Sequence, residues 1–215
     1  ISPSSPITKD AIIDKGNLDS SLVYTFEDHE GSVRALAFSP NARSLATVSE
    51  DRTARIYDVV KGKPVEHAVL RGHTDAVVGV AFSPNRPILA TSSADSTVIL
   101  WDTNTWEEIR TLRPKIVGTI RQVKFSPDGS KIVMSYTDPD IGNSEIYILD
   151  LNTRISTRIT DNSSIDVSAS FSPDGKKIVF NSDRGGTQQL YLMDSNGRNV
   201  KRISFGKGRY ATPVW

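Results

Sequence analysis

One short motif returns along the chain at nearly constant spacing, and it restricts the possible folds more than any other feature. An aromatic residue ends a short apolar run, and in most copies Ser-Pro follows it: Phe38, Phe82, Phe125, Phe171 and Trp215. Successive copies are 44, 43, 46 and 44 residues apart. A period of this length indicates an array of equivalent units, in which a residue type that recurs at one phase is structural in most cases.

Each repeat contains four short segments with strand-forming composition. In one repeat these are the run ending at Phe82 and residues 88–93, 98–102 and 107–112, with turns rich in Asp, Ser, Gly and Thr between them. No apolar stripe with a helical period persists for three turns. The pattern predicts an all-β chain built from four-stranded antiparallel sheets, which are the blades of a β-propeller.

The two ends of the chain supply complementary parts of one further repeat. Residues 11–14 align with a third strand and residues 22–26 with an outer strand, whereas residues 210–215 align with an inner strand. We therefore predict one domain over residues 1–215, a five-bladed β-propeller with four complete blades. In the fifth blade, the C-terminal strand pairs with the N-terminal partial blade, which closes the ring and removes two exposed sheet edges.

The composition limits the class of protein without selecting a function. The chain has 215 residues, of which 37% are hydrophobic, and this suffices for one β-rich domain. It has no cysteine, which excludes disulfides and thiolate metal sites. No run of 18 apolar residues occurs, and the opening segment lacks the basic and apolar regions of a signal peptide. We expect a soluble chain with no membrane segment and assign it no compartment.

The two halves of the chain differ in charge and in spacing. Residues 1–112 contain 11 Lys and Arg against 15 Asp and Glu, whereas residues 113–215 contain 15 against 10. From the repeated aromatic residue to the Asp that ends the third strand, the distance is 20 residues in the first two complete repeats, then 25 and 23. The longer hairpins indicate two kinds of blade, joined between Asp102 and Phe125.

Residues 20–112 resemble the WD-repeat family. The resemblance is carried by Gly-His at 72–73 and LATSSADSTVILWD at 89–102, and by a weaker copy with Asp-His at 28–29 and LATVSEDRTARIYD at 45–58. It implies WD-like blades over 1–112. It also implies a hydrogen-bonded chain of His, Ser or Thr, Asp and Trp in each blade, in which buried polar groups supply one another's partners. By motif position the members are His73, Ser93, Asp95 and Trp101, and His29, Ser49, Asp51 and Tyr57.

Residues 113–215 resemble the propeller of the periplasmic TolB family. The segment FSPDGKKIVFNSDRGGTQQLYLMDSNGRNVKRIS at 171–204 is close to its repeat, and 125–160 follows the same pattern with a longer hairpin. The resemblance implies TolB-like blades in this half. We expect neither the TolB-like N-terminal domain nor most of its propeller in this chain, so the family's role in binding envelope proteins is not carried over. Two families in one chain indicate an engineered or recombined chimera.

The residues that could suggest a catalytic or metal-binding site have structural explanations. The carboxylates at one phase of every repeat are expected in turns and at strand ends, and none is predicted to be catalytic: Asp58, Asp102, Asp150 and Asp194. The three histidines do not form a metal-binding pattern, and no phosphate loop or nucleophile elbow occurs. Glycoside hydrolysis needs paired carboxylates, but the inner strands contain only Asp166. We predict no enzyme activity, no cofactor and no metal.

The sequence therefore predicts a non-catalytic propeller scaffold, an engineered chimera with no dedicated activity, that is monomeric and requires no partner. The alternative is a natural interaction module that binds a protein or peptide on the face where the inner strands begin. Residues at that phase vary between blades and are the candidate contacts: Arg34, Arg121, Asp166 and Tyr210. The basic residues of 176–209 are spread over several strands and turns, so nucleic-acid binding is not predicted.

Overall fold

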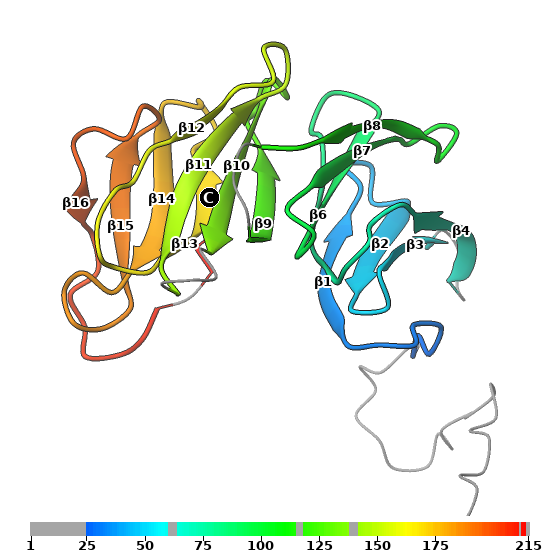
Figure 1. Cartoon of the computed structure of the whole chain (residues 1–215), viewed down its shortest axis with the longest axis horizontal. Helices are drawn as coiled ribbons and strands as arrows, with labels where there is room; N and C mark the ends of the chain where they lie inside the picture. The colour runs from blue at the N-terminus through cyan, green and yellow to red at the C-terminus, as the bar shows by residue number, and fades with distance from the viewer. Residues whose placement is uncertain (1–24, 60–63, 115–117, 138–141, 211, 214–215) are drawn as a thin grey trace, which may run out of the picture.

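The computed structural model describes residues 25–59, 64–114, 118–137, 142–210 and 212–213. Over these residues it contains sixteen strands in four sheets and no helix, so no helix there could cross a membrane. Each sheet has four antiparallel strands that pair in chain order, and the four sheets fan around a common centre (Figure 1). The prediction of an all-β propeller is confirmed.

Each blade uses four consecutive strands, the first innermost and the fourth outermost. In the first two blades the strands are β1 (Val33–Phe38), β2 (Ser44–Ser49), β3 (Thr53–Asp58), β4 (Val65–Arg71), β5 (Val77–Phe82), β6 (Ile88–Ser93), β7 (Val98–Asp102) and β8 (Glu108–Leu112). In the last two they are β9 (Thr119–Phe125), β10 (Lys131–Thr137), β11 (Ser144–Asp150), β12 (Ser156–Arg158), β13 (Asp166–Phe171), β14 (Lys177–Ser182), β15 (Gln189–Asp194) and β16 (Lys201–Arg202). These bounds lie within a few residues of the predicted strands.

The hydrophobic cores lie between neighbouring sheets. One core joins the first two blades, for example through Ile56 on β3 and Val77 on β5. A second joins Leu100 on β7 to Ile120 on β9, and a third joins the last two blades. The second and third blades are apolar on both faces because each packs against a neighbour on either side, so either blade alone would expose its part of two cores.

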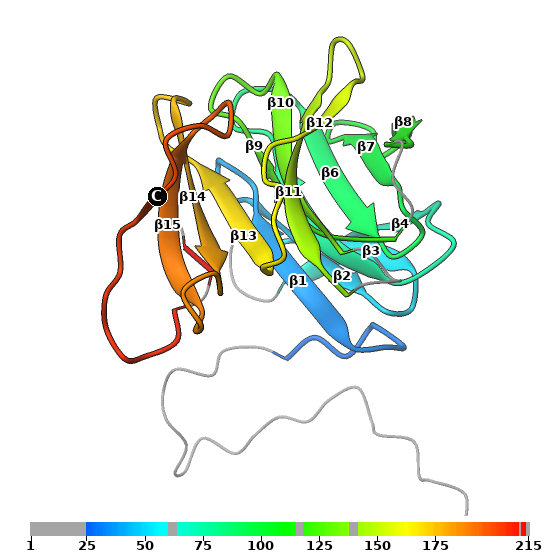
Figure 2. The same cartoon turned by 60° about the vertical axis from the view of Figure 1, so that its left-hand side comes forward.

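The inner strands β1, β5, β9 and β13 surround a shared central space (Figures 1 and 2). Their close approach requires small side chains. A Cβ atom added at Gly79 on β5 would lie 3.1 Å from the Cα of Gln122 on β9, and it would also collide with the Ser92 hydroxyl. Glycine at this position therefore allows the second and third blades to meet at their inner strands.

Most of the predicted fifth blade, residues 1–24, 211 and 214–215, lies outside the described residues. The described residues of its predicted strands, 25–26, 210 and 212–213, form no strand. The described part contains the connection that leads towards it. The Ile146 N–H donates to the Thr160 hydroxyl at 2.9 Å, and 44 residues later the Leu190 N–H donates to the Ser204 hydroxyl at 2.8 Å. The segment after Ser204 therefore leaves the fourth blade with the same hydrogen bond that holds the segment after Thr160 to the third blade. It reaches Tyr210, whose carbonyl accepts a hydrogen bond from the side chain of Asn181 on β14.

The turn that follows each inner strand is built from the Ser-Pro motif. In the fourth blade the Ser172 hydroxyl donates to Asp174 at 2.6 Å and accepts from the Lys177 N–H at 2.9 Å, while Gly175 has a φ of +70°. Equivalent hydroxyl bonds occur in the first and third blades. These turns therefore use their carboxylate or amide as a structural acceptor, which is the role predicted for recurrent polar residues.

The first turn has alanine where the fourth has glycine, and this predicts a stabilising change. Ala42 has a φ of 55°, a left-handed conformation that costs a residue with a Cβ about 1 kcal/mol. Ala42→Gly should raise the free energy of unfolding in urea by about 0.5–1 kcal/mol. The reciprocal control is Gly175→Ala, which should lower it by a similar amount, since the new Cβ would meet nothing closer than 3.6 Å. A loss of stability in Ala42→Gly would contradict this account of the turn.

Candidate functional site

A buried hydrogen-bonded chain runs through the second blade. The Trp101 indole N–H on β7 donates to the Thr91 hydroxyl on β6 at 2.9 Å, and Thr91 lies 2.8 Å from His73 Nε2. His73 Nδ1 lies 2.9 Å from Asp95 in the turn between these strands. A carboxylate accepts only, so Nδ1 carries the proton and Nε2 accepts from Thr91. The chain ties the connection from the first blade to two strands of the second.

The hydroxyl in this chain belongs to Thr91, and the assignment of Ser93 is corrected. Ser93 lies two residues further along β6, where its hydroxyl donates to the Asp75 carbonyl and accepts from the Asp95 N–H, both at 3.0 Å. It therefore orients the turn that presents Asp95. The first blade repeats this arrangement, because Ser49 accepts from the Asp51 N–H at 3.1 Å.

The first blade contains most of the same hydrogen-bonded side chains, but the last member differs. His29 lies 2.7 Å from Asp51 and 2.8 Å from the Thr47 hydroxyl. Tyr57 replaces tryptophan, and its hydroxyl donates to Asp28 at 3.2 Å. Burial, reinforced by Asp28, raises the pKa of Tyr57, so the phenol stays protonated as the donor.

The Tyr57 and Asp28 pair of the first blade corresponds to the Trp101 and Gly72 pair at the same phase of the second blade. Gly72 occupies the position of Asp28, and a Cβ there would lie 3.1 Å from the Ile99 side chain and 3.3 Å from the Trp101 ring. These two side chains leave little room for a larger residue at position 72, whereas in the first blade a carboxylate fits at this position and bonds to the Tyr57 phenol. Sequence comparison of single positions does not show this exchange, because it involves two residues together.

The last two blades use a different buried network that the sequence analysis missed. In the third blade, Glu145 at the start of β11 accepts from Arg158 at 2.9 Å and is also bonded to the Thr160 hydroxyl. In the fourth, Gln189 accepts from the Ser204 hydroxyl at 2.8 Å. In both blades an Arg Nε donates to the carbonyl two residues later, at 2.8 and 2.6 Å. The available signal was Arg-Ile-Thr at 158–160 and Arg-Ile-Ser at 202–204, each 13 residues after the Glu or Gln.

The predicted contact residues do not form one exposed set. Asp166 is fully buried, accepting from Arg184 at 2.7 Å and from Asn162 at 2.8 Å, and therefore does not belong to an exposed face. Arg184 also stacks over two aromatic rings. Arg34 and Arg121 are exposed at inner-strand bulges, where a residue has no partner in the adjacent strand. The sequence placed these residues at equivalent positions of the repeat. It did not show that the long side chain of Arg184 bonds to Asp166.

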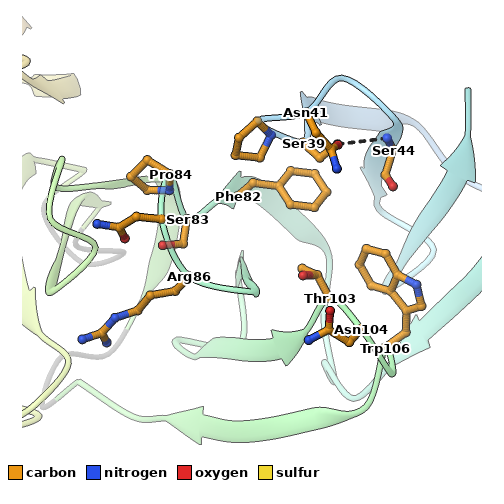
Figure 3. Close-up of a pocket in the computed structure, with 12 residues that line it drawn as sticks. Ser39, Asn41, Ser44, Phe82, Ser83, Pro84, Arg86, Thr103, Asn104 and Trp106 are labelled. Carbon is orange, nitrogen blue, oxygen red and sulfur yellow. Dashed lines mark hydrogen bonds between the residues drawn. The ribbon is translucent and has the colours of Figure 1, made fainter. Parts of the chain in front are cut away.

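Two cavities open beside the Ser-Pro turns. The axial mouth, about 430 Å³, lies at the ends of the four inner strands, and its aromatic lining residues are Phe38, Phe82, Phe125 and Phe171. The interblade groove, about 290 Å³, lies between the first and second blades, with Phe82 and Trp106 among its walls (Figure 3). Among the described residues no group of three or more His, Cys, Asp or Glu side chains is placed to hold a metal ion.

Four sheets around an axis, tied by buried polar networks, define the class of a β-propeller. The family described as TolB beta propeller domain matches residues 65–215, and the family described as WD domain, G-beta repeat matches residues 20–58. Because the first match covers more than half of the chain, the chain belongs to the TolB beta propeller domain family. The second blade lies within that match although its polar chain resembles that of WD repeats.

Individual relatives match over shorter stretches. Tol-Pal system protein TolB from three strains of Helicobacter pylori is 43% identical over 67 residues, covering 31% of this chain and 16% of the relative. The chain thus matches a small part of the length of these relatives. The solved structure of a protein assigned as TolB from Agrobacterium tumefaciens superposes with a TM-score of 0.68 and 22% identity, over 82% of this chain and 63% of that chain. It supports the fold.

The assignment of Thr91 predicts unequal costs in the two WD-like blades. Thr91→Val keeps the shape but leaves both the Trp101 N–H and His73 Nε2 without partners, so the free energy of unfolding should fall by about 2–4 kcal/mol. Thr47→Val removes the hydroxyl from His29 alone and should cost about 1–2 kcal/mol. Urea unfolding of both variants measures the difference. Equal losses would mean that Thr91 does not link the Trp101 indole to the His73 imidazole.

The contact between Tyr57 and Asp28 predicts an energetic coupling between these two positions. Tyr57→Trp alone should lower the free energy of unfolding by about 1–3 kcal/mol, because the indole would overlap the Asp28 side chain. Asp28→Gly alone removes one hydrogen bond. Combined, the two changes should cost less than the sum of the single losses by more than about 0.5 kcal/mol in a double-mutant cycle. Additive losses would show that the two positions are independent.

The buried histidine predicts a loss of stability in mild acid. Burial lowers the pKa of His73 below its ordinary value of 6.5, an effect that the nearby Asp95 only partly offsets. As the pH falls below 6.5, the unfolded chain binds a proton that the folded chain resists, so the free energy of unfolding should fall. Urea unfolding at several pH values between about 7.5 and 5.5 measures this slope. Rising stability over this range would contradict the account.

Proposed function

We propose that the chain is a non-catalytic propeller scaffold, a chimera that joins blades of two lineages and carries out no reaction of its own. The observation that supports it most strongly is the change of network between blades. The first two blades use His73 and His29 chains, whereas the last two use Glu145 and Gln189. A continuous apolar core between the second and third blades joins the two types. The chemically capable side chains of these networks are engaged in holding strands together.

The second candidate is a natural protein-interaction module. Its support is the family itself, since the TolB propeller is a scaffold for protein interaction, and the two cavities beside the Ser-Pro turns. The exposed Arg34 and Arg121 remain candidate contacts on the opposite face, where the inner strands begin, together with the half-buried Tyr210.

Light scattering and affinity capture separate the two candidates. A monomer near 23.6 kDa that unfolds in one transition and captures no stoichiometric partner supports the scaffold. One partner at a fixed ratio supports the interaction module. Its loss on Arg34→Glu or Arg121→Glu, but not on Arg110→Glu at an exposed outer strand, would assign it to the face where the inner strands begin. Catalytic turnover by the pure protein that is abolished by Asp166→Asn would overturn both.

A further inference from the structure

Two blade faces are not covered by a neighbouring sheet of the described structure. On the first blade, Leu36 of β1 is 60% exposed, although its equivalent on β5, Val80, is buried in the core between the first two blades. On the fourth blade, Ile203 is 47% exposed, whereas its equivalent Ile159 packs against the third core. Both faces therefore have the composition of half a core, and both border the place of the predicted fifth blade.

A contact between Phe26 and Tyr57 shows in which register the fifth blade would meet the first. The centroids of the two rings lie 4.4 Å apart. Leu70 on β4 follows Phe26 by 44 residues, and Trp101 on β7 follows Tyr57 by 44 residues. Leu70 and Trp101 lie together in the core between the first two blades. Phe26, the last residue of a predicted outer strand, therefore contacts the first blade as Leu70 contacts the second.

The same register brings a carboxylate opposite a guanidinium. In each described core, the residue four positions before the Asp that ends a third strand lies with the residue three positions before that Asp in the next blade. The pairs are Ala54 with Ile99, Val98 with Tyr147, and Ile146 with Tyr191. Asp14 ends the predicted third strand of the fifth blade, so the corresponding pair between the fifth and first blades is Asp10 and Arg55.

Arg55 on β3 has donors that the described residues do not use. Its guanidinium can donate five hydrogen bonds, and the one acceptor among the described residues is Glu66, which is bonded to Nη1. Nε has no hydrogen-bond partner in the described part of the chain, and the side chain as a whole is 14% exposed. A largely buried guanidinium without enough acceptors is unfavourable, and a carboxylate is its strongest acceptor.

We propose that the N-terminal segment of this chain covers the open face of the first blade, and that the Asp10 carboxylate pairs there with the Arg55 guanidinium. Residues 10–14 form the third strand of the fifth blade, with Ile12 beside Tyr57. This ion pair takes the place of the apolar pairs that join the described blades. The proposal rests on the predicted fifth blade and adds the contact that sets its register.

The length of the segment favours an occupant from the same chain. Sixteen residues separate Asp10 from Phe26, and sixteen separate Ala54 from Leu70, which pair across β3 and β4. Phe26 already lies against Tyr57 of its own chain. A hairpin like that of β3 and β4 is therefore long enough to bring Asp10 of the same chain to Arg55.

The charge of the pair selects this strand over an apolar strand from another protein. Among the described residues no ion pair joins two of the four sheets, so apolar packing alone holds them together. An apolar strand, or the N-terminal strand shifted by one position, would leave Arg55 without its second carboxylate. A charge left unpaired in a core is strongly unfavourable, so the pair specifies one strand in one register.

A double-mutant cycle on the full chain tests the ion pair. Asp10→Ala and Arg55→Ile each leave one charge unpaired, so each should raise the equilibrium constant for unfolding about tenfold or more. Together they recreate the Ala54 and Ile99 pair of the first core, and the double variant should match the parent to within about threefold. Urea unfolding measures all four proteins. Asp19→Ala, which aligns with the connection between β3 and β4, is the matched control and should unfold like the parent.

Chemical cross-linking tests which chain supplies the strand. The chain has no cysteine, so Asp10→Cys with Arg55→Cys introduces one reactive pair. Facing sheets pack about 10 Å apart, a distance that a short bis-maleimide spans. The proposal predicts a link within one chain, seen as a monomer on a denaturing gel and as a joined peptide by mass spectrometry. Asp19→Cys with Arg55→Cys should cross-link to a smaller extent.

Each contrary result identifies which part of the proposal is wrong. Links between two chains would assign the strand to a second copy. No link within or between chains would show that the N-terminal segment does not cover the first blade, which would overturn the fifth blade as well and leave the face to another protein. A link within one chain together with additive losses in the cycle would overturn the ion pair while the fifth blade stands.

Discussion

Apolar packing between neighbouring sheets is the interaction on which the rest of this structure depends. Each of the three cores takes its residues from two blades, and no blade contains a complete core of its own. The second strands show this most clearly, since residues 45–49 of β2 are buried without the alternation of a one-sided sheet. A blade is therefore stable because of its neighbours, as in other repeat proteins, and a change in one blade is felt in the next.

Buried polar networks complete the packing, and the two halves use different chemistry at related places. In the second blade, His73 ties the connection between blades to β6 through Thr91. In the third, Glu145 binds the residues after the outer strand, including Thr160 and Asn162. Both solutions anchor the segment that leads from one blade to the next. Because the core at the junction is apolar, it requires no polar group of one network to match the other, and the two kinds of blade can be adjacent.

The fold was predictable from sequence to a greater degree than the site. Period and strand composition indicate the four sheets, because apolar packing imposes the same pattern on every repeat. The hydroxyl of the polar chain was placed two residues too far, at Ser93, since residues 91 and 93 share one face of β6 and only the approach of His73 distinguishes them. Asp166 was placed at a surface because its partner Arg184 lies 18 residues away, in the β14–β15 hairpin of the same blade. Such contacts depend on tertiary geometry and have no local signal.

Native-state hydrogen exchange on the intact chain tests the central claim most directly, which is that packing between sheets makes the four blades one cooperative unit. The amides to follow are those of the second strands, β2, β6, β10 and β14, which lie within the sheets away from both edges. The account predicts that all four open with the same free energy to within about 1 kcal/mol, equal to that of global unfolding. Two separate opening energies, one for β2 and β6 and another for β10 and β14, would show that the two kinds of blade fold independently and would contradict it.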